Sequence, residues 1–171
     1  MVIVPATKAD IPAIVQLVNS AYRGEESKKG WTTEADLLTG TMRTDERTLV
    51  VELEDPSSLI LLCRLDPEAT LAGCVYLQKR TDHLYLGMLS VSPLRQAQGI
   101  GKALLAAANA YAQTHHYRCI RMTVISVRHE LIAWYERHGF KATGQILPFP
   151  DEHDFGIPTR PLEFAVLEKK W

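Results

Sequence analysis

Apolar residues in this chain follow two different periods, and the period found in each segment predicts the element that the segment forms. Residues 11–22 carry apolar side chains at every third or fourth position behind a capping Asp10, which is typical of an amphipathic helix. Residues 100–114 are rich in Ala and Leu without a helix breaker, and Gly139 suits the C′ position that ends a later helix. Residues 45–54 contain a β-branched run that also suits a strand, although their acidic start and the Asp-Pro that follows favour a helix. The predicted helices are Ile11–Tyr22, Glu34–Thr39, Asp45–Glu54, Ile100–Thr114 and Glu130–His138.

Shorter runs of apolar and β-branched residues lie between turn residues and predict the strands of a sheet. Three of them follow one another within residues 58–91, joined by short polar turns, which indicates an antiparallel meander. The predicted strands are Val2–Val4, Ser58–Leu65, Thr70–Lys79, Leu84–Val91, Cys119–Ile125, Lys141–Leu147 and Leu162–Glu168. Residues 23–31 are expected to form a polar loop, and the long Pro-rich connection at 148–161 is expected to form a functional one. The order of helices and strands predicts one α+β domain, residues 1–171, built on a mixed sheet.

Composition excludes several classes of protein. The 171 residues are 46% hydrophobic, and 19 Lys and Arg stand against 20 Asp and Glu, so no strong overall charge attracts nucleic acid or an anionic membrane. Cys63, Cys74 and Cys119 each lie in an apolar run without the spacing of a zinc or redox motif. Neither a signal peptide nor a membrane-spanning run is present in the sequence. We therefore expect a soluble, cytoplasmic protein with buried cysteines. If it binds an anion, a local group of residues must hold that anion, because the overall charge does not attract it.

A glycine-containing turn between a predicted strand and a predicted helix is the strongest chemical signal. The first amides of a helix lack intrahelical partners, and without side chains at Gly99 and Gly101 a phosphate can approach them closely. Lys102 adds a positive charge. The segment lacks the Gly-Lys-Ser/Thr of a Walker loop and the third glycine of a dinucleotide fingerprint. Taken alone, such a turn also serves simply to connect a strand to a helix.

Two segments carry a resemblance to a known family. Residues 96–101, Gln-Ala-Gln-Gly-Ile-Gly, match the [QR]-x-x-G-x-[GA] acetyl-CoA loop of the GNAT family of N-acetyltransferases, and Val-x-Pro at 91–93 and Lys-Ala-Leu-Leu at 102–105 extend the match. Residues 134–140, Trp-Tyr-Glu-Arg-His-Gly-Phe, resemble the family's Y-E-x-x-G-F segment. The resemblance implies the GNAT fold: a mixed, mostly antiparallel central sheet that splays between its fourth and fifth strands and is flanked by helices.

The resemblance also implies roles for individual residues. The turn at 96–103 would hold the pyrophosphate of acetyl-CoA, and the backbone of residues 89–91 would pair with its pantetheine. The Leu89 N–H is then the candidate donor to the carbonyl oxyanion, and Tyr135 the general acid that protonates the departing thiolate. Both residues would also suit ordinary core positions. The expected cofactor-binding residues are Leu89, Ser90, Val91, Gln96, Ala97, Gln98, Gly99, Ile100, Gly101, Lys102, Ala103, Arg128 and Tyr135.

Two positions depart from the family's pattern. Arg128 stands where many members carry Asn, and it could reach a phosphate, an acidic acceptor or solvent. Tyr85 stands where histone-type members carry a carboxylate base, so the base acts through water or comes from another segment. We expect Glu34 and Tyr85 to contact the acceptor, with His153 and Asp154 as further candidates from the Pro-rich loop. Candidates for the base are Glu25, Glu26, Glu34, Asp36, His83 and His129, of which Glu34 is preferred.

The activity implied by the resemblance is direct transfer of the acetyl group of acetyl-CoA to a primary amine of a small molecule. We expect no metal, no covalent enzyme intermediate, and neither nucleic acid nor membrane as a partner. Two other functions stay open: a non-catalytic acyl-CoA binding or sensing module, and acetylation of a protein lysine or N-terminus. A homodimer also stays open.

Overall fold

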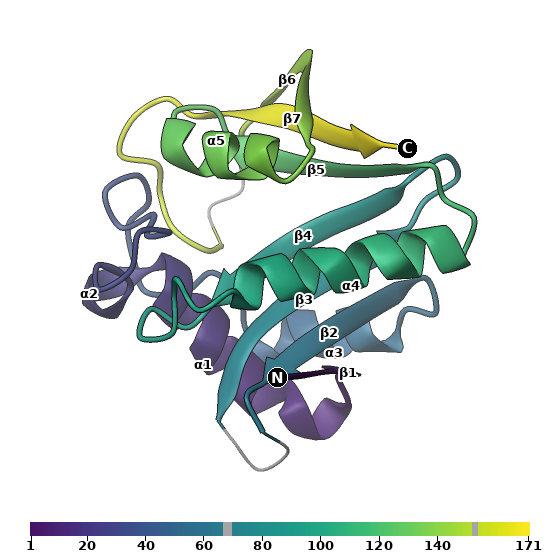
Figure 1. The fold of residues 1–171 in the computed structure, drawn as a ribbon. Coiled ribbons are helices and arrows are strands. Elements are labelled where there is room, and N and C mark those ends of the chain that lie inside the picture. Colours follow the sequence, from purple (N-terminus) through teal and green to yellow (C-terminus); the bar gives the residue numbers. More distant parts are fainter. Residues whose placement is uncertain (67–69, 152–153) are drawn as a thin grey trace.

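The computed structural model describes residues 1–66, 70–151 and 154–171, which form one sheet with helices on both faces (Figure 1). The strand order is β1-β2-β3-β4-β5-β7-β6, and every neighbouring pair is antiparallel except β4 and β5. The strands are β1 (Val2–Pro5), β2 (Ser58–Arg64), β3 (Leu71–Lys79), β4 (Leu84–Val91), β5 (Cys119–Ile125), β6 (Lys141–Pro148) and β7 (Glu163–Lys170). The helices are the 3-10 turn η1 (Lys8–Asp10), α1 (Ile11–Tyr22), α2 (Gly24–Ser27), α3 (Glu46–Glu54), α4 (Ile100–Thr114) and α5 (His129–Arg137). The α+β class and the antiparallel meander of β2, β3 and β4 are confirmed.

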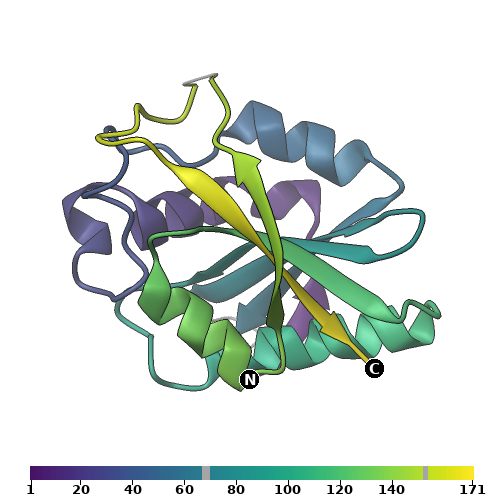
Figure 2. The ribbon, with the colours of Figure 1, turned by 90° about the horizontal axis from the view of Figure 1, so that it is seen from above.

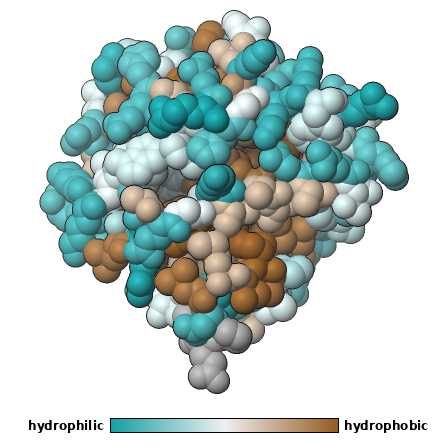
Figure 3. All heavy atoms as spheres, in the orientation of Figure 1, coloured by the Kyte–Doolittle hydropathy of each residue, from teal (hydrophilic) through white to brown (hydrophobic). Residues whose placement is uncertain are grey.

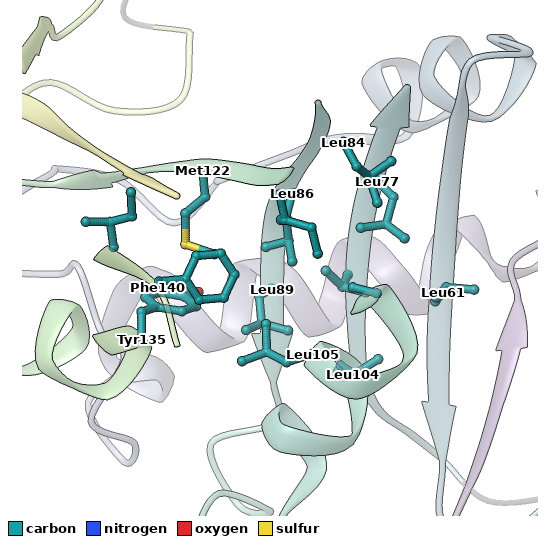
Figure 4. Packing of buried hydrophobic residues seen from close by; sticks show 14 of the residues in the cluster. Leu61, Leu77, Leu84, Leu86, Leu89, Leu104, Leu105, Met122, Tyr135 and Phe140 are labelled. Carbon is teal, nitrogen blue, oxygen red and sulfur yellow. The ribbon is translucent and has the colours of Figure 1, made fainter. Parts of the chain in front are cut away.

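Two hydrophobic cores hold the helices against the sheet. Helices α1 and α3 cover one face, and α4 runs across the other (Figures 1 and 2). On the α4 side, Leu89 and Leu105 lie across the core from Met122, Tyr135 and Phe140 (Figure 4). Full burial of each large apolar side chain contributes roughly 1.5–3 kcal/mol, so both cores stabilise the sheet between them.

The pairing between β4 and β5 ends soon after it begins. The two strands align in parallel only at Leu84 with Ile120 and at Tyr85 with Arg121. Further along β4, its register with β3 shifts, and Met88 adopts a positive φ of 51°. A bulge of this kind bends a strand and re-aims its backbone groups. The predicted splay between the fourth and fifth strands is therefore present, and it opens beside residues 86–91.

Two local predictions between α1 and α3 are wrong. The expected helix Glu34–Thr39 does not form: one turn closes from Leu38 N to Glu34 O, and Leu38 then pairs with Pro158. Long-range hydrogen bonds between residues 37–39 and 157–159 hold this segment extended, and they outweigh its weak helical signal. The expected loop at 23–31 contains the one-turn helix α2. Most of the turn before β3 and the candidate His153 lie outside the described residues.

No helix within the described ranges is long and apolar enough to cross a membrane. The three cysteines are free and buried in strands, as expected.

Candidate active site

A cavity of about 480 Å³ opens between the first turn of α4 and helix α5. Figure 3 shows this face of the molecule, with a hollow between the two helices. The cavity is lined by the end of β4, the glycine turn, α5, the last residue of α1 and the segment that follows α2. Its lining residues are Tyr22, Trp31, Thr32, Leu89, Val91, Gln96, Ala97, Gly99, Ile100, Gly101, Lys102, Glu130, Leu131, Trp134, Tyr135, Arg137 and His138.

The glycine turn presents unpaired backbone amides to this cavity. Gly99 is the N-cap of α4 with φ of 80°, and Ala97 also has a positive φ, of 64°. The amides from Ala97 to Lys102 have no hydrogen-bond partner among the described residues, whereas the Ala103 amide already bonds to Gly99 O at 2.9 Å. Successive amides in such a turn, at the positive end of a helix dipole, form an anion-binding site. The residues present therefore fit a pyrophosphate.

Gly101 has a different role from Gly99. Its φ is not positive, and a Cβ built on it would lie 3.3 Å from the Trp134 ring. At Gly99 a Cβ would meet nothing within 4 Å, so only the left-handed backbone requires glycine there. The missing side chain of Gly101 thus lets Trp134 pack on the start of α4 and form one wall of the cavity.

The Gln96 side chain holds a neighbouring segment over the turn. Its Oε1 accepts from Trp31 N–H at 2.9 Å, and its Nε2 donates to Thr32 Oγ1 at 2.9 Å. A Cβ at Gly30 would lie 2.6 Å from the same Oε1, so glycine is required for this close approach. Trp31 lies 6.3 Å from Trp134, ring centre to ring centre. Gln96 is therefore a positioning residue whose side chain is already occupied.

The end of α5 fixes Tyr135 in a Schellman motif. The Phe140 amide bonds to Tyr135 O at 3.1 Å, and the Gly139 amide bonds to Glu136 O at 3.0 Å. Gly139 is at C′ with φ of 94°, as its sequence position predicts. The rings of Tyr135 and Phe140 meet edge to face at 5.7 Å. This geometry explains why a tyrosine, a glycine and a phenylalanine occur at that spacing.

Tyr135 is buried with its side chain in the wall between two cavities. It is 5% exposed, and burial raises the pKa of its phenol, with the nearby Tyr22 adding to the effect. The Tyr135 hydroxyl has no hydrogen-bond partner among the described residues. A neutral phenol with no protein partner is free to donate its proton to a group placed in the cavity.

Three side chains fix the backbone of the β4 bulge. The Tyr22 hydroxyl donates to the Leu89 carbonyl. Ser90 Oγ donates to the Met88 carbonyl at 3.1 Å, and Cys74 Sγ contacts the same oxygen at 3.9 Å. Cys74 belongs to the core on the α1 side, so the Met88 carbonyl points that way. Across the trans peptide the Leu89 N–H points in the opposite direction, toward the face that carries Tyr135.

Beyond Tyr22 and Tyr135 lie two smaller cavities. One, of about 250 Å³, contains Tyr85, Leu89, Arg128 and Tyr135 in its wall. The other, of about 330 Å³, is lined by Arg23 and by residues of the Pro-rich connection, including Phe149, Asp154 and Phe155. Both are lined by Glu34, Arg43, Ile125 and Phe164. The three cavities therefore lie side by side in a row. Leu89 and Tyr135 lie between the largest of the three and the cavity of about 250 Å³.

Glu34 and Arg128 form a buried ion pair in this region. Arg128 Nη1 lies 3.2 Å from Glu34 Oε1, and Arg23 Nε lies 3.3 Å from Glu34 Oε2. Arg128 Nη2 also donates to Thr32 O at 2.6 Å. The three charged side chains are 4–9% exposed. Arg128 thus lines the second cavity rather than the glycine turn, and both oxygens of Glu34 accept from guanidinium groups.

The remaining candidates fall into two groups. Lys102, Val91 and Tyr85 line cavities, whereas Gln98 is exposed and the buried Ser90 acts through its hydrogen bond to Met88. Of the candidates for the base, Glu34 alone lines any of the three cavities within the described part of the chain. The candidates that line none of them are Glu25, Glu26, Asp36, His83 and His129. Among the described residues, no group of three His, Cys, Asp or Glu side chains is placed to hold a metal ion.

Two residues of the site were missed by the sequence analysis. Tyr22 was expected to be a core residue of α1, although a buried tyrosine hydroxyl needs a polar partner and finds it at Leu89. Arg43 follows an expected helix that does not form, and nothing in the sequence distinguishes it from a surface arginine. Both depend on contacts between segments far apart in the chain.

Comparison with known proteins agrees with this geometry. The model of the acetyltransferase (GNAT) family matches residues 11–140. No curated protein matches the chain. Among solved structures, the ribosomal-protein-alanine N-acetyltransferase of Brucella melitensis is 20% identical, with both chains covered fully and a TM-score of 0.73. The putative acetyltransferase yncA of Salmonella typhimurium, solved with acetyl-CoA, is 18% identical over 99% of this chain and 93% of its own, with a TM-score of 0.71. The IAA acetyltransferase of Bacillus cereus is 18% identical over 99% of both chains, with a TM-score of 0.66.

Proposed function

The chain belongs to the GNAT family of acetyl-CoA-dependent acetyltransferases, and from this premise we propose that it transfers acetyl directly to a primary amine of a small molecule. The observation that carries the proposal is the position of Leu89 and Tyr135. Both lie in the wall between the cavity of the glycine turn and the cavity beyond it. A thioester bound from one side would thus meet an amine from the other.

The chain's own groups account for binding of the first substrate. The free amides from Ala97 to Lys102 donate hydrogen bonds to the pyrophosphate oxygens, and the Lys102 side chain lies beside them in the same cavity. Trp134 and Gln96 keep the walls of this cavity in place. Acetyl-CoA, when bound, supplies the thioester that the amine attacks.

Two groups then stabilise the transfer. The Leu89 N–H donates to the carbonyl oxygen as negative charge develops on it, and the bonds to Tyr22 and Ser90 hold the peptide in position. Tyr135 donates its proton to the sulfur as the carbon–sulfur bond breaks. Burial raises the pKa of Tyr135, so the phenol carries this proton at neutral pH.

Glu34 is not needed as the general base. Both Glu34 oxygens are already engaged by guanidinium groups, Oε1 by Arg128 and Oε2 by Arg23, so the carboxylate is occupied as an ion-pair partner. We assign to Glu34 the positioning of Arg23 and Arg128, and we propose that the amine loses its proton to water in the open cavity. Tyr85 contacts the acceptor from the wall of the second cavity.

The small size of the cavities on the acceptor side supports a small molecule. Arg23 Nη1 donates to Met42 O at 3.0 Å and to the Phe155 carbonyl, and Leu38 pairs with Pro158. These contacts hold the Pro-rich connection in place beside the cavity of about 330 Å³, and the adjoining cavity is about 250 Å³. The acceptors named for the similar structures range from a ribosomal protein to IAA, so the shared fold does not choose between the two classes of acceptor.

The test is turnover of acetyl-CoA by the full chain with a panel of small primary amines, with free thiol release and acetylated product both measured. We expect product with at least one small amine and none with the matched tertiary amines. Acetylation of peptide N-termini or lysines at higher kcat/KM than any small amine would contradict the proposed acceptor class. Thiol release without acetylated product would contradict transfer itself.

A further inference from the structure

Arg43 is a partly buried arginine that lines both acceptor-side cavities. We propose that Arg43 binds a carboxylate of the acceptor, so that the substrate is a small amine that also carries a carboxylate, such as an amino acid. This inference rests on the proposed function and names the class of its acceptor.

The backbone on both sides of Arg43 is held in place by helix α1. Asn19 Oδ1 accepts from the Arg43 amide at 2.6 Å and from the Thr44 amide at 3.0 Å, and Asn19 Nδ2 donates to Thr44 O at 3.1 Å. The Arg43 guanidinium then lies over the Tyr22 ring, 5.8 Å from its centre. The Arg43 side chain is thus held at the site by its contact with the Tyr22 ring.

The charge of Arg43 is not neutralised in the structure. Among the described residues, the Arg43 side chain makes no hydrogen bond and has no carboxylate oxygen within 4.0 Å. Glu34 is already shared by Arg23 and Arg128. Burial raises the pKa of Glu52, and the nearby positive charge of Arg43 partly offsets this increase. Glu52 nevertheless lies too far from Arg43 for an ion pair. A partly buried guanidinium without a counterion favours an anionic ligand.

The distance to the reacting groups suits a small substrate. Tyr22 contacts Arg43 through its ring and the Leu89 carbonyl through its hydroxyl, so a single tyrosine side chain separates the guanidinium from Leu89. An acceptor whose carboxylate lies on Arg43 can therefore place its amine beside Leu89 and Tyr135. Guanidinium groups bind carboxylates through two parallel hydrogen bonds, which also orients the ligand.

The experiment compares amino acids with their carboxamides, which keep the amine and the side chain but lose the negative charge. The carboxamide's amine has the lower pKa, because a neighbouring carboxylate favours the ammonium form, so intrinsic reactivity favours the carboxamides. We expect the parent protein to show a higher kcat/KM with the acids. In Arg43→Gln this acid-to-amide ratio should fall by about 10- to 150-fold, the effect of one hydrogen bond to a charged group. Arg43→Lys should keep part of the ratio.

Two controls separate this role from a structural one. Arg47→Gln removes an exposed arginine four positions away and should keep the ratio. Calorimetric titration with CoA should show that Arg43→Gln binds it like the parent. Equal kcat/KM for acids and amides in the parent, or an unchanged ratio in Arg43→Gln, would overturn the inference while the proposed function stands. A complete lack of turnover with acids, amides and every other small primary amine of the panel would overturn both.

Discussion

Replacement of Tyr135 by phenylalanine tests the proposed general acid most directly. The ring and its edge-to-face contact with Phe140 stay, and the hydroxyl is the one group that is lost. Because that hydroxyl has no partner among the described residues, its removal leaves no buried donor or acceptor unpaired. A tyrosine with a structural hydrogen bond would lose about 1 kcal/mol, which in a chain of this length corresponds to a drop in Tm of about 2–4 °C. We expect a Tm within about 1 °C of the parent.

The chemical step should respond far more strongly. General acid catalysis contributes about 10²–10⁴-fold, so kcat should fall by that factor under conditions where chemistry limits turnover. Pre-steady-state thiol release establishes that condition, because product release can otherwise hide the effect. Tyr111→Phe is the matched control: Tyr111 stacks on His115 at the far end of α4 and should keep full activity. A kcat within about threefold of the parent in Tyr135→Phe would show that the proton comes from another donor.

Three further predictions concern the ion pair, the glycine turn and the cysteines. Glu34→Gln leaves two buried guanidinium groups without their carboxylate, so we expect a loss of about 3–5 kcal/mol and a Tm lower by about 6–20 °C, measured by calorimetry; a fall of less than about 3 °C would contradict the buried ion pair. Gly101→Val displaces Trp134 and should weaken CoA binding more than about tenfold in titration calorimetry, whereas Gly99→Ala, with open space but a strained φ, should mainly cost about 1–2 kcal/mol of stability. Burial raises the pKa of the Cys74 thiol to about 12, and it raises the pKa of the other two thiols, so a thiol reagent at pH 8 should label no cysteine in the native protein and all three after unfolding.

The pH dependence of stability follows from the same burial. The folded-state pKa of Tyr135 lies above its unfolded value near 10, so below pH 10 the phenol is protonated in both states. As the pH rises above 10, the folded state binds more protons than the unfolded state, and the free energy of unfolding falls. In Tyr135→Phe this component is absent, so the alkaline loss of stability should be smaller than in the parent.

Elements whose signal is local were predicted well from the sequence. Gly99 caps the start of α4, and Gly139 occupies the C′ position after α5. Both positions have a positive φ, which favours glycine. Likewise the boundaries of α1 and α4 match their apolar periodicity. Such features depend on residues a few positions apart, which is the range over which sequence patterns carry information.

The acceptor side could not be predicted in this way. Glu34 was expected at the acceptor groove and lines two of the cavities, but its two arginine partners come from the end of α1 and from the residue before α5. The segment after it pairs with residues 157–159 instead of forming a helix. Its conformation depends on contacts across more than a hundred residues of chain, for which a single sequence offers no periodic signal.

The gap in the sheet between β4 and β5 also accounts for the place that we propose for the chemistry, at Leu89. Backbone groups that lose a neighbouring strand need other partners, and in β4 the Leu89 and Met88 carbonyls find them in the side chains of Tyr22, Ser90 and Cys74. Carbonyl oxygens in an acetyl-transfer site would repel the developing oxyanion, so these bonds direct them away from it. Because the Met88–Leu89 peptide is trans, the Leu89 N–H points away from the Met88 carbonyl, toward the face that carries Tyr135. Loss of strand pairing and the proposed oxyanion site are therefore one structural feature, and a substitution such as Tyr22→Phe, which frees the Leu89 carbonyl, should lower kcat more than it raises the KM for acetyl-CoA.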